Sequence, residues 1–543
     1  MSNTYQAAGI FSFNNTLSGD NVADFMLGDV SGFTQAGGLY LNFTGFNWSA
    51  FVQDTWHLRP ALTVTAGLRW DPFLPYTDSE GRVACFVPGA QSQRYPNSPV
   101  DLIFGGSNHD AGCPQSSIYN NLGNVGPRIG FSSRLTADGN TSLRGGAGYY
   151  YERPNTVSFE DIVGVPPFAP IVGLSDVNFT DPYGSAGVAN PFPQQFGPRT
   201  PGSDATFPQD ISFTQIFDRH FRLPQVFTWN LTLERGIGSD WLIRAAYMGN
   251  KGTYLGGTGD QESGLLQVNP AIYIPGQSTE GNTQQRRIYP SFGFIDSINS
   301  GVNSSYNALQ LGLQKRFSRG FSFLANYTWA RALDSFGPNG SPGGNGTNTC
   351  TCGRYFDYGP SDGDVNKTFR ISGDYNFPSL PLHSVADKLI NGWSLTGIAN
   401  WQTGFPFTIF SDYDNSFSQN GADRADLTVP QLKDALLSSG RSHAQLVNEW
   451  FNTSAFGPNA IGTFGDTGKN IIRGPRYFDT DLGLLKNTKV DERVSLQFRA
   501  EFYNAFNNVN FGTPDSGLTD SSFGQITSAQ DPRILQMALK ATF

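Results

Sequence analysis

A glycine-rich run with a lysine near its end is the part of this sequence closest to a phosphate-binding loop. It reads GTFGDTGKN, Gly462–Asn470. The phosphate-binding pattern is G-x-x-x-x-G-K-[ST], whose backbone N–H groups cradle phosphates and whose Ser/Thr hydroxyl reaches Mg²⁺. Thr463 stands where the first glycine is needed, and Asn470 replaces the Ser/Thr. We therefore interpret the run as a loop turn.

The histidines and cysteines are not arranged for catalysis. There is no H-E-x-x-H or C-x-x-C motif, the signatures of zinc proteases and of redox or zinc sites. A hydrolytic triad could not be assembled from neighbouring histidines, because all five are scattered: His57, His109, His220, His383 and His443. We expect no enzyme activity and no cofactor.

Two groups of aspartates deserve comparison with a calcium site. Asp357, Asp362 and Asp364 lie close together, as do Asp412 and Asp414. Carboxylate oxygens suit Ca²⁺, but neither group has the register of an EF-hand loop. The prediction is that both are solvated loop carboxylates and that the chain has no metal site.

In several segments, polar and charged residues alternate with apolar ones. Near the C-terminus Leu496, Phe498 and Ala500 alternate with Gln497 and Arg499. This two-residue period is typical of a strand with one apolar face, and about ten residues span a membrane at a tilt. Similar alternation occurs at 62–71, 227–234, 241–247, 321–329, 393–401 and 535–543. A soluble sandwich with one wet face per sheet has the same periodicity and stays open at this point.

Composition narrows the class of protein. The chain has 543 residues, 63 of them glycine, with 14% aromatic and only 15% charged residues and a net charge of −9. A net negative charge argues against sequence-independent nucleic-acid binding. No apolar run approaches the length of a membrane-spanning helix. A high content of glycine and aromatic residues, together with few charged residues, is typical of a large β protein. A transmembrane β-barrel is one such protein.

Connection lengths favour the barrel. Very short turns are expected at His57–Ala61, Ala137–Thr141, Gly236–Asp240, Ser318–Gly320 and Thr488–Asp491. Long connections alternate with them, at Pro72–Asn124, Arg153–Leu223, Leu255–Asn303, Asp334–Asn366, Gly404–Arg476 and Asn504–Pro532. A medium connection, Pro378–Ile390, is the exception. Compact soluble domains rarely contain such long loops, whereas outer-membrane barrels combine short periplasmic turns with long extracellular loops.

The predicted fold is thus all-β, an antiparallel transmembrane β-barrel with about thirteen strands, or fourteen if Gly38–Phe43 is one. One short loop helix is expected at Pro430–Ser439, with Leu432, Ala435 and Leu436 on one face. A lumen tolerates charge and a lipid face does not. We therefore expect these charged residues to face the lumen: Arg69, Arg144, Glu234, Arg244, Arg370, Arg499, Glu501 and Lys540.

Several motifs together resemble a known family. They are FVQDTWHLRPALTVTAGLRWD (51–71), WNLTLERGIGSDWLIRAAYMGNKGTYL (229–255), SSYNALQLGLQKRFSRGFSFLANYTWARALD (304–334), WFNTSAF (450–456), RGPRYFDTDLGLLKN (473–487) and ERVSLQFRAEFYNAFNNVNFGTP (492–514). From about Ala23 to the end, the chain resembles the barrel of Oar-like TonB-dependent receptors, which are abundant in Acidobacteria and related soil bacteria. The closing QMALKATF, ending at Phe543, resembles the terminal strand that the outer-membrane barrel assembly machinery recognises.

The resemblance implies a location in the outer membrane, contact with its lipid, and energised uptake of an extracellular substrate. Family barrels have 22 strands, and the family's signal peptide, regulatory domain, TonB-contacting segment and plug have no counterpart here. We therefore expect residues 1–543 to form one barrel domain, the C-terminal portion of a receptor. Coupling to the TonB complex would run through the missing N-terminal region. The alternatives are a non-transporting surface-binding or assembly protein, or a passive porin.

The four cysteines lie in two expected outer loops. Cys85 and Cys113 share one, and Cys350 and Cys352 share another. A route through an oxidising periplasm favours disulfides. Four cysteines allow three pairings, and closing a loop as long as that between Cys85 and Cys113 should stabilise by roughly 3–4 kcal/mol. We predict Cys85–Cys113 and a tighter Cys350–Cys352 bridge, with unpaired thiols or a Cys-x-Cys metal site as alternatives.

Overall fold

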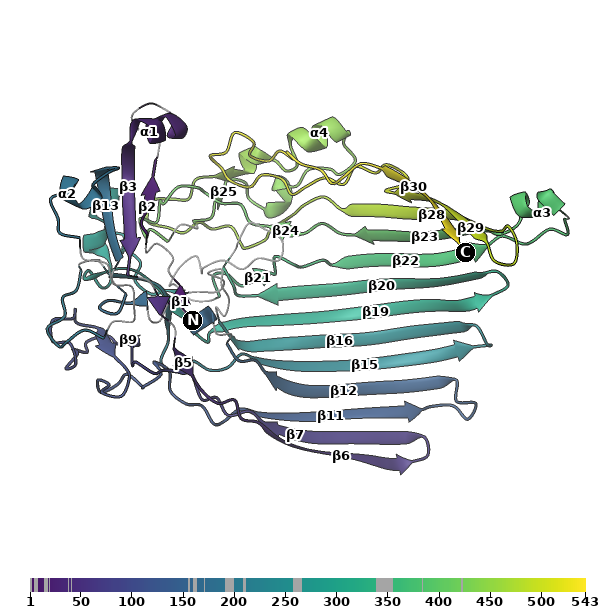
Figure 1. Cartoon of the computed structure of the whole chain (residues 1–543), viewed down its shortest axis with the longest axis horizontal. Coiled ribbons are helices and arrows are strands. Elements are labelled where there is room, and N and C mark those ends of the chain that lie inside the picture. The colour runs from purple at the N-terminus through teal and green to yellow at the C-terminus, as the bar shows by residue number, and fades with distance from the viewer. Residues whose placement is uncertain are drawn as a thin grey trace.

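A large antiparallel sheet dominates the computed structural model, which describes residues 2–3, 8–13, 18, 20–37, 39–40, 42–154, 157–159, 164–169, 171–190, 200–208, 211–256, 266–337, 355–382, 384–420 and 423–543. Thirteen strands follow one another across the sheet in chain order (Figure 1). They are β6 (Ala50–Arg59), β7 (Leu62–Trp70), β11 (Val125–Arg134), β12 (Thr141–Tyr151), β15 (Gln225–Ile237), β16 (Trp241–Leu255), β19 (Val302–Ser318), β20 (Phe321–Asp334), β22 (Lys367–Asn376), β23 (Trp393–Gln402), β28 (Tyr477–Lys489), β29 (Ser495–Tyr503) and β30 (Ile534–Thr542). The two-residue β21 (Gly359–Pro360) is a fourteenth member, paired with the end of β20.

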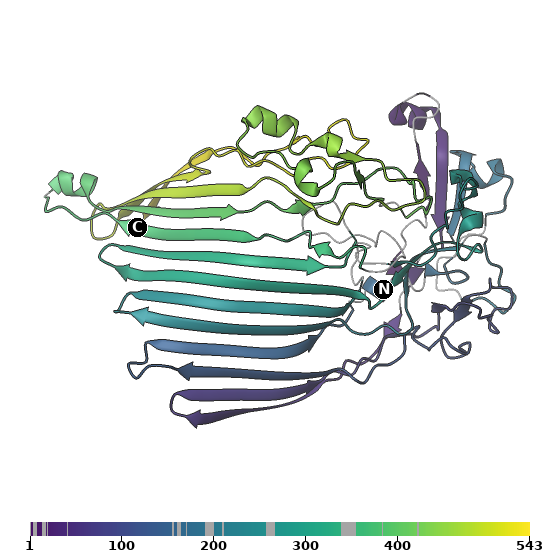
Figure 2. The ribbon, with the colours of Figure 1, turned by 180° about the vertical axis from the view of Figure 1, so that it is seen from behind.

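The connections sort to the two ends of the sheet. Five turns of two to six residues lie at one end, together with the medium connection 377–392. The six long connections, 71–124, 152–224, 256–301, 335–366, 403–476 and 504–533, all lie at the other. Figure 2 shows the same segregation from behind. We call these the turn end and the loop end; the alternation of short and long connections is as the sequence predicts.

The two faces of the sheet differ in chemistry. Seven directly paired positions on one face form a line that we call the apolar row: Leu233, Ala245, Leu311, Tyr327, Phe369, Trp401 and Phe478. Leu311 is 45% exposed and Phe369 38%. Since a contiguous exposed apolar surface marks a membrane or protein contact, this face is suited to hydrocarbon. It arises directly from the two-residue alternation of the sequence.

The predicted extra strand at Gly38–Phe43 is wrong as a member of the large sheet. The strand residues of this segment lie instead in two separate two-stranded sheets. In one, β4 (Leu39–Tyr40) pairs with β1 (Ser2–Asn3), and in the other, β5 (Phe43–Thr44) pairs with β8 (Thr77–Asp78). Two-residue pairings of this kind belong to the loop end. β4 and β5 have only two residues each, which is too short to run the length of the sheet.

Among the residues that the structure describes, no strand pairs with the outer side of either edge of the large sheet, and the two edge strands run in the same direction. β6 and β30 each pass from the loop end to the turn end, because twelve antiparallel steps separate them. The two edges therefore cannot pair antiparallel with each other. An odd number of additional strands would be needed to join them by antiparallel pairing alone.

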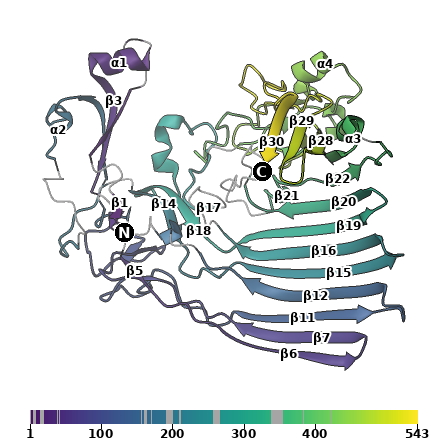
Figure 3. The same cartoon turned by 45° about the vertical axis from the view of Figure 1, so that its right-hand side comes forward.

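The long connections fold together at the loop end (Figure 3). One buried cluster takes Phe104 from the first connection, Phe168 and Phe213 from the second, and Phe292 and Ile295 from the third. A second cluster packs Phe407 and Phe451 of the fifth connection against residues of the sixth. The loops thus share apolar cores, which hold them in place as a folded layer above the sheet.

Short elements complete this layer. The strands there are β9 (Ala84–Phe86), β10 (Leu102–Phe104), β14 (Ile211–Phe217), β17 (Leu266–Gln267), β18 (Phe292–Ile298), β24 (Pro406–Phe407), β25 (Asp426–Leu427), β26 (Phe456–Gly457) and β27 (Ile472–Arg473). The N-terminal β2 (Ile10–Ser12) and β3 (Asp29–Ala36) form a small sheet with β13 (Ile171–Asn178), beside α1 (Asn21–Leu27) and α2 (Pro182–Ser185). No helix in the described ranges is long and apolar enough to cross a membrane.

The helix predicted at Pro430–Ser439 is wrong in length. Only one 3₁₀ turn forms there, Leu432–Ala435, and a separate helix, α4 (His443–Asn448), follows. Ala435 is fully buried in the loop core, whereas Leu436 is exposed, extended and bridged to Phe451. Tertiary packing of Ala435 and this bridge end the helix after one turn.

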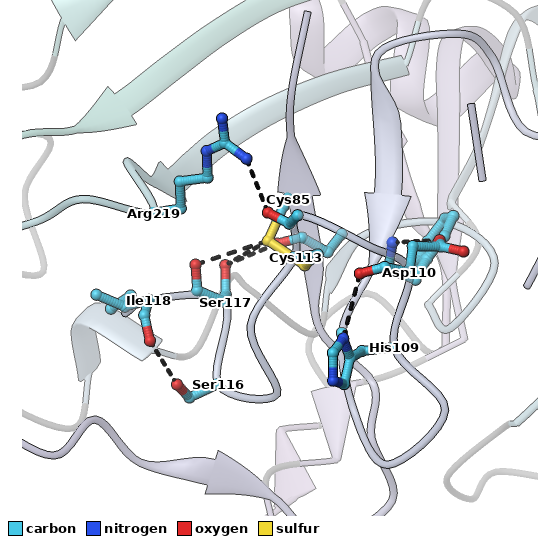
Figure 4. Close-up of a disulfide and its surroundings, with 12 residues drawn as sticks. Cys85, His109, Asp110, Cys113, Ser116, Ser117, Ile118 and Arg219 are labelled. Carbon is cyan, nitrogen blue, oxygen red and sulfur yellow. Dashed lines mark hydrogen bonds between the residues drawn. A yellow bond between two sulfur atoms is a disulfide. The ribbon is translucent and has the colours of Figure 1, made fainter. Parts of the chain in front are cut away.

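A disulfide joins Cys85 of β9 to Cys113, with Cα atoms 5.6 Å apart (Figure 4). Both cysteines are buried with Ile103. Arg219 of the second connection donates to the backbone oxygen of Gly112, 2.9 Å away, and so ties the bridged loop to its neighbour. Cys350 and Cys352 lie outside the described residues.

Asp110 organises the same loop through four hydrogen bonds. Its carboxylate accepts from the hydroxyl of Ser92 at 2.6 Å and from backbone N–H groups of Gln93, Arg94 and Phe104 at 2.8–2.9 Å. Burial alone opposes ionisation, but the hydrogen bonds outweigh it and lower the pKa of Asp110 below its ordinary value. The charged form therefore stabilises this loop.

Charge on the apolar row should destabilise the protein. We expect Leu311→Arg to lower the free energy of unfolding by about 2–4 kcal/mol, because Leu311 lies midway along β19 on the lipid-suited face. Gln310→Arg, one position away on the other face, is the matched control and should have little effect. Urea unfolding of the protein in lipid vesicles measures both, and equal losses would contradict a membrane-facing apolar row.

The effect of Asp110 should depend on pH. We expect Asp110→Asn to lower the free energy of unfolding of the loop layer by about 1–3 kcal/mol at neutral pH, since hydrogen bonds to a charged acceptor are lost. Because the pKa of Asp110 is lowered by folding, its contribution is present above the ordinary aspartate pKa. It is lost as the pH falls through the folded value. Limited proteolysis over a pH series measures this; a difference that grows on acidification would contradict the assignment.

Candidate functional site

The second face of the sheet carries a line of polar side chains beside the apolar row. We call it the polar row: Glu234, Arg244, Gly312, Asn326, Arg370, Asn400 and Asp479, each directly opposite the next on neighbouring strands. Every member is one residue away from a member of the apolar row. The same alternation that makes one face apolar therefore concentrates polar groups on the other.

A hollow of 480 Å³ lies on this polar face. Arg244, Asn326 and Arg370 line it, together with Gln310 and Thr368 of the next row toward the loop end. Gly312 sits between Arg244 and Asn326, and a side chain there would approach both at 3.3 Å. Its absence lets Arg244 reach across β19 to Asn326, with Nη2 3.3 Å from Oδ1.

The two arginines in the hollow have no ionic partner among the described residues. The ion pairs found in the described ranges involve neither Arg244 nor Arg370. Glu234, opposite Arg244, is instead 3.7 Å from Arg144. Two guanidinium groups beside an amide have the chemistry that binds a carboxylate or phosphate, which Arg can hold through paired hydrogen bonds.

The other predicted lumen charges lie on the same face but not in the hollow. Arg69 pairs with Asp71 at 2.8 Å near the loop end, and Arg499 is 3.8 Å from Glu501 on β29. Lys540 lies opposite Gln497 near the turn end. All eight residues thus share one face by register, and the structure brings only Arg244 and Arg370 to one hollow.

Two ion pairs, one of them buried on both sides, join the loops directly above the hollow. Lys469 Nζ lies 2.5 Å from Asp334 Oδ1, and both side chains are almost fully buried. Arg473 Nη2 pairs with the carboxylate of Asp364, which also accepts the backbone N–H of Ala332 at 2.7 Å. These contacts attach the fifth connection to the fourth and to the end of β20.

The prediction that Asp357, Asp362 and Asp364 are solvated is wrong. All three are buried, at 3% exposure or less. Asn470 donates to Asp362 at 2.5 Å, and Arg473 pairs with Asp364. Asn470 and Arg473 lie more than a hundred residues away from Asp362 and Asp364, so the local sequence pattern gave no sign of this burial.

The glycine-rich run 462–470 supplies these partners. Gly465 has φ +85°, and a Cβ there would fall 1.9 Å from the backbone oxygen of Arg424. Lys469 and Asn470 point into the ion-pair network. The run is a structural turn, as predicted, and its lysine pairs with Asp334.

A serine motif that the sequence also contains has no catalytic setting. Residues 359–363 read G-P-S-D-G, which matches the G-x-S-x-G pattern of serine hydrolases. In those enzymes the serine lies on a sharp strand-to-helix turn. Here Gly359 and Pro360 form the short β21, and Ser361 continues into a turn, donating its N–H to Ala332.

The remaining candidates do not form a catalytic or metal site in the described part of the chain. Asp412 accepts hydrogen bonds from Thr519, and Asp414 accepts them from Ser416 and Ser418. His383 lies outside the described residues. No group of three or more His, Cys, Asp or Glu is placed to hold a metal ion in the ranges that the structure describes.

Arg424 is a buried residue that sequence reasoning did not single out. It is 1% exposed, its guanidinium carbon lies 4.0 Å from the ring centre of Phe356, and Nη2 donates to the Phe356 oxygen. Burial lowers its pKa, while the charge of Asp357 acts in the opposite direction. No local pattern around Arg424 could have revealed this placement.

The sequence matches a family of outer-membrane proteins. The family model described as "Outer membrane beta barrel domain" matches residues 1–536. The chain belongs to this family. It is therefore an outer-membrane protein whose sheet is of the outer-membrane barrel type. No curated protein matches the sequence.

Solved outer-membrane proteins show distant likeness to this outer-membrane barrel domain. The transporter YddB from Escherichia coli is 9% identical, with a TM-score of 0.42 over 91% of this chain and 45% of that one. The ferric-catecholate import receptor Fiu of Escherichia coli is 10% identical, with a TM-score of 0.37 over 94% and 45%. The ferric yersiniabactin uptake receptor FyuA from Yersinia pestis is 10% identical, with a TM-score of 0.37 over 94% and 46%. This chain spans just under half the length of each.

Breaking one buried ion pair should loosen the loop layer. We expect Lys469→Met to lower the free energy of unfolding by about 3–5 kcal/mol, because Asp334 would keep a buried charge without its partner. The double variant Asp334→Leu/Lys469→Met is the control and should recover most of the loss. Urea unfolding of the two single variants and the double variant gives the interaction energy between the two residues. If the loss in the double variant equals the sum of the two single losses, the residues do not interact.

Proposed function

We propose that this chain is the barrel portion of a TonB-dependent outer-membrane transporter that takes up an anionic substrate. The observation that carries the proposal is the hollow in which Arg244 and Arg370 have no described ionic partner. It lies on the polar face, beneath a loop layer held by buried cores and ion pairs. A substrate held by the loops would next meet these arginines.

The lengths of the connections set the orientation of the barrel in the membrane. The loop end faces outward and the turn end faces the periplasm, as in barrels with long extracellular loops. The polar face lines the lumen, with all eight predicted charged residues on it. Residues 1–543 act as one barrel domain. Phe543, directly after β30, serves as the assembly signal. Energy reaches the barrel through the TonB complex and a plug outside these residues.

The ordered loop layer gives the second candidate function its support. A cluster shared by three connections, braced by the Cys85–Cys113 disulfide, is suited to binding at the cell surface without uptake. Both functions involve binding, so only accumulation inside the cell separates them. A passive porin differs from both, because it would give uptake that neither saturates nor requires energy.

Anion binding should depend on the two arginines. We expect the Arg370→Gln variant of the natural protein to bind citrate about 10–100-fold more weakly than the unsubstituted protein. The reason is that each well-placed hydrogen bond to a charged group contributes about 1.5–3 kcal/mol. Lys540→Gln, a cation on the same face outside the hollow, is the matched control and should leave affinity unchanged. Isothermal titration with citrate, and with neutral raffinose as a comparison, measures the effect. Equal losses for both variants, or equal binding of raffinose, would overturn the anion site.

Uptake tests the transport step. Cells carrying the natural protein are given radiolabelled citrate, with and without a protonophore that collapses the inner-membrane gradient. Saturable accumulation that the protonophore abolishes is the expected result. Binding without accumulation would favour the surface-binding function, and non-saturable, protonophore-insensitive entry would favour a porin. Either outcome would overturn TonB-dependent transport.

A further inference from the structure

The medium connection between β22 and β23 exposes apolar side chains at the turn end. It contains α3 (Ser384–Ile390), which lies beyond the other turns (Figure 1). Val385 is 67% exposed, Leu389 65% and Ile390 51%. At 100° per residue these three lie on one side of the helix, and Asp387 and Lys388 lie on the other. A solvated turn would not need this apolar side, and the other turns at this end have two to six residues.

Hydrogen bonds fix α3 on the apolar side of the sheet. The indole N–H of Trp393 donates to the Leu389 oxygen at 3.2 Å, and the Thr488 hydroxyl donates to the Lys388 oxygen at 3.3 Å. Trp393 and Thr488 both belong to the apolar face, because Trp393 pairs through Lys486 with Phe498 and Thr488 pairs with Leu496. α3 therefore extends the lipid-suited face rather than the polar one.

Aromatic side chains make the helix continuous with that face. Tyr375, at the end of β22, lies directly opposite Leu395. Its ring packs edge-on against Phe377, with centroids 5.1 Å apart, and Phe377 begins the connection to α3. Amphipathic aromatic rings are enriched where a membrane meets water. These rings and α3 therefore lie at the boundary of the apolar band.

Two lysines mark the same level. Lys315 and Lys486 lie on the apolar face by register, opposite Trp241 and Trp393. Each bends its ammonium group toward the turns: Lys315 Nζ reaches the Ser318 hydroxyl at 2.7 Å, and Lys486 Nζ reaches the Asn391 oxygen at 2.5 Å. Both lysine side chains are buried, at 5% and 7% exposure, and the turns supply oxygen acceptors for their ammonium groups. The apolar face therefore ends at the level of these two residues.

We propose that α3 is an interfacial anchor that lies in the lipid leaflet at the turn end. Val385, Leu389 and Ile390 insert among the acyl chains, continuing the apolar face of β22 and β23. Lys388, which is exposed on the other side of the helix with its Nζ 2.7 Å from the Val490 oxygen, lies at the level of the anionic phospholipid headgroups. The occupant of the exposed helix face is thus phospholipid. The anchor does not depend on whether the protein transports its substrate.

Depth-dependent quenching tests the anchor in the natural protein, reconstituted in vesicles of phosphatidylethanolamine and phosphatidylglycerol. Leu389→Cys and Asp387→Cys are labelled with nitrobenzoxadiazole, with the unsubstituted protein as the blank for the native cysteines. Only preparations with native heat-modifiable migration in gels are compared. We expect doxyl-labelled lipid to quench the label at 389 several-fold more than at 387, and aqueous iodide to show the reverse order.

Two results would overturn the proposal. Equal quenching of both positions by iodide would place α3 in water. Protection of position 389 from both quenchers would mean that protein, either another chain or a second copy, covers the helix. The contact with anionic headgroups is tested by repeating the doxyl measurement with phosphatidylcholine in place of phosphatidylglycerol. Weaker quenching at 389 is expected in these vesicles. Unchanged quenching there would overturn the role of anionic headgroups.

Discussion

The need to hydrogen-bond every backbone group within hydrocarbon constrains this structure more than any single contact. Neighbouring strands of the large sheet satisfy that need by pairing in chain order, each antiparallel to the last. The two edges, β6 and β30, are exceptions, and their shared direction prevents them from satisfying each other by antiparallel pairing. A strand that pairs antiparallel with either edge would have to run from the turn end to the loop end.

Pairing in chain order also determines what the two faces can do. Leu311 and Gly312 are adjacent in sequence, yet one belongs to an exposed apolar row and the other to a polar row with two arginines. When one face of the sheet contacts lipid, only the opposite face can present polar side chains to water-soluble molecules. At the turn end the apolar face continues into α3, and at the loop end the polar face meets a folded layer of loops.

The loop layer is held by contacts that ordinary surface loops lack. Phe104, Phe213 and Phe292 come from three connections and share one core. Lys469 and Asp334 form a buried pair, which is costly to desolvate and therefore sensitive to loss of either partner. Such ties keep the loops at fixed positions above the hollow, which is a requirement for a selective binding surface.

The sequence by itself determined the strands, the lengths of their connections and the two faces of the strands that alternate clearly, because a two-residue alternation is a local property of the chain. It also pointed to the Cys85–Cys113 pairing, since both cysteines lie in one connection. Only the tertiary structure decided which loop charges are buried. Asp364 and Arg473 meet across more than a hundred residues, and nothing in their neighbourhoods encodes that contact. Tertiary contacts also decided the length of the helix at Pro430–Ser439, where packing of Ala435 limits it to one turn. They decided the hollow as well, because Gly312 of one strand leaves space for the side chain of Arg244 on another.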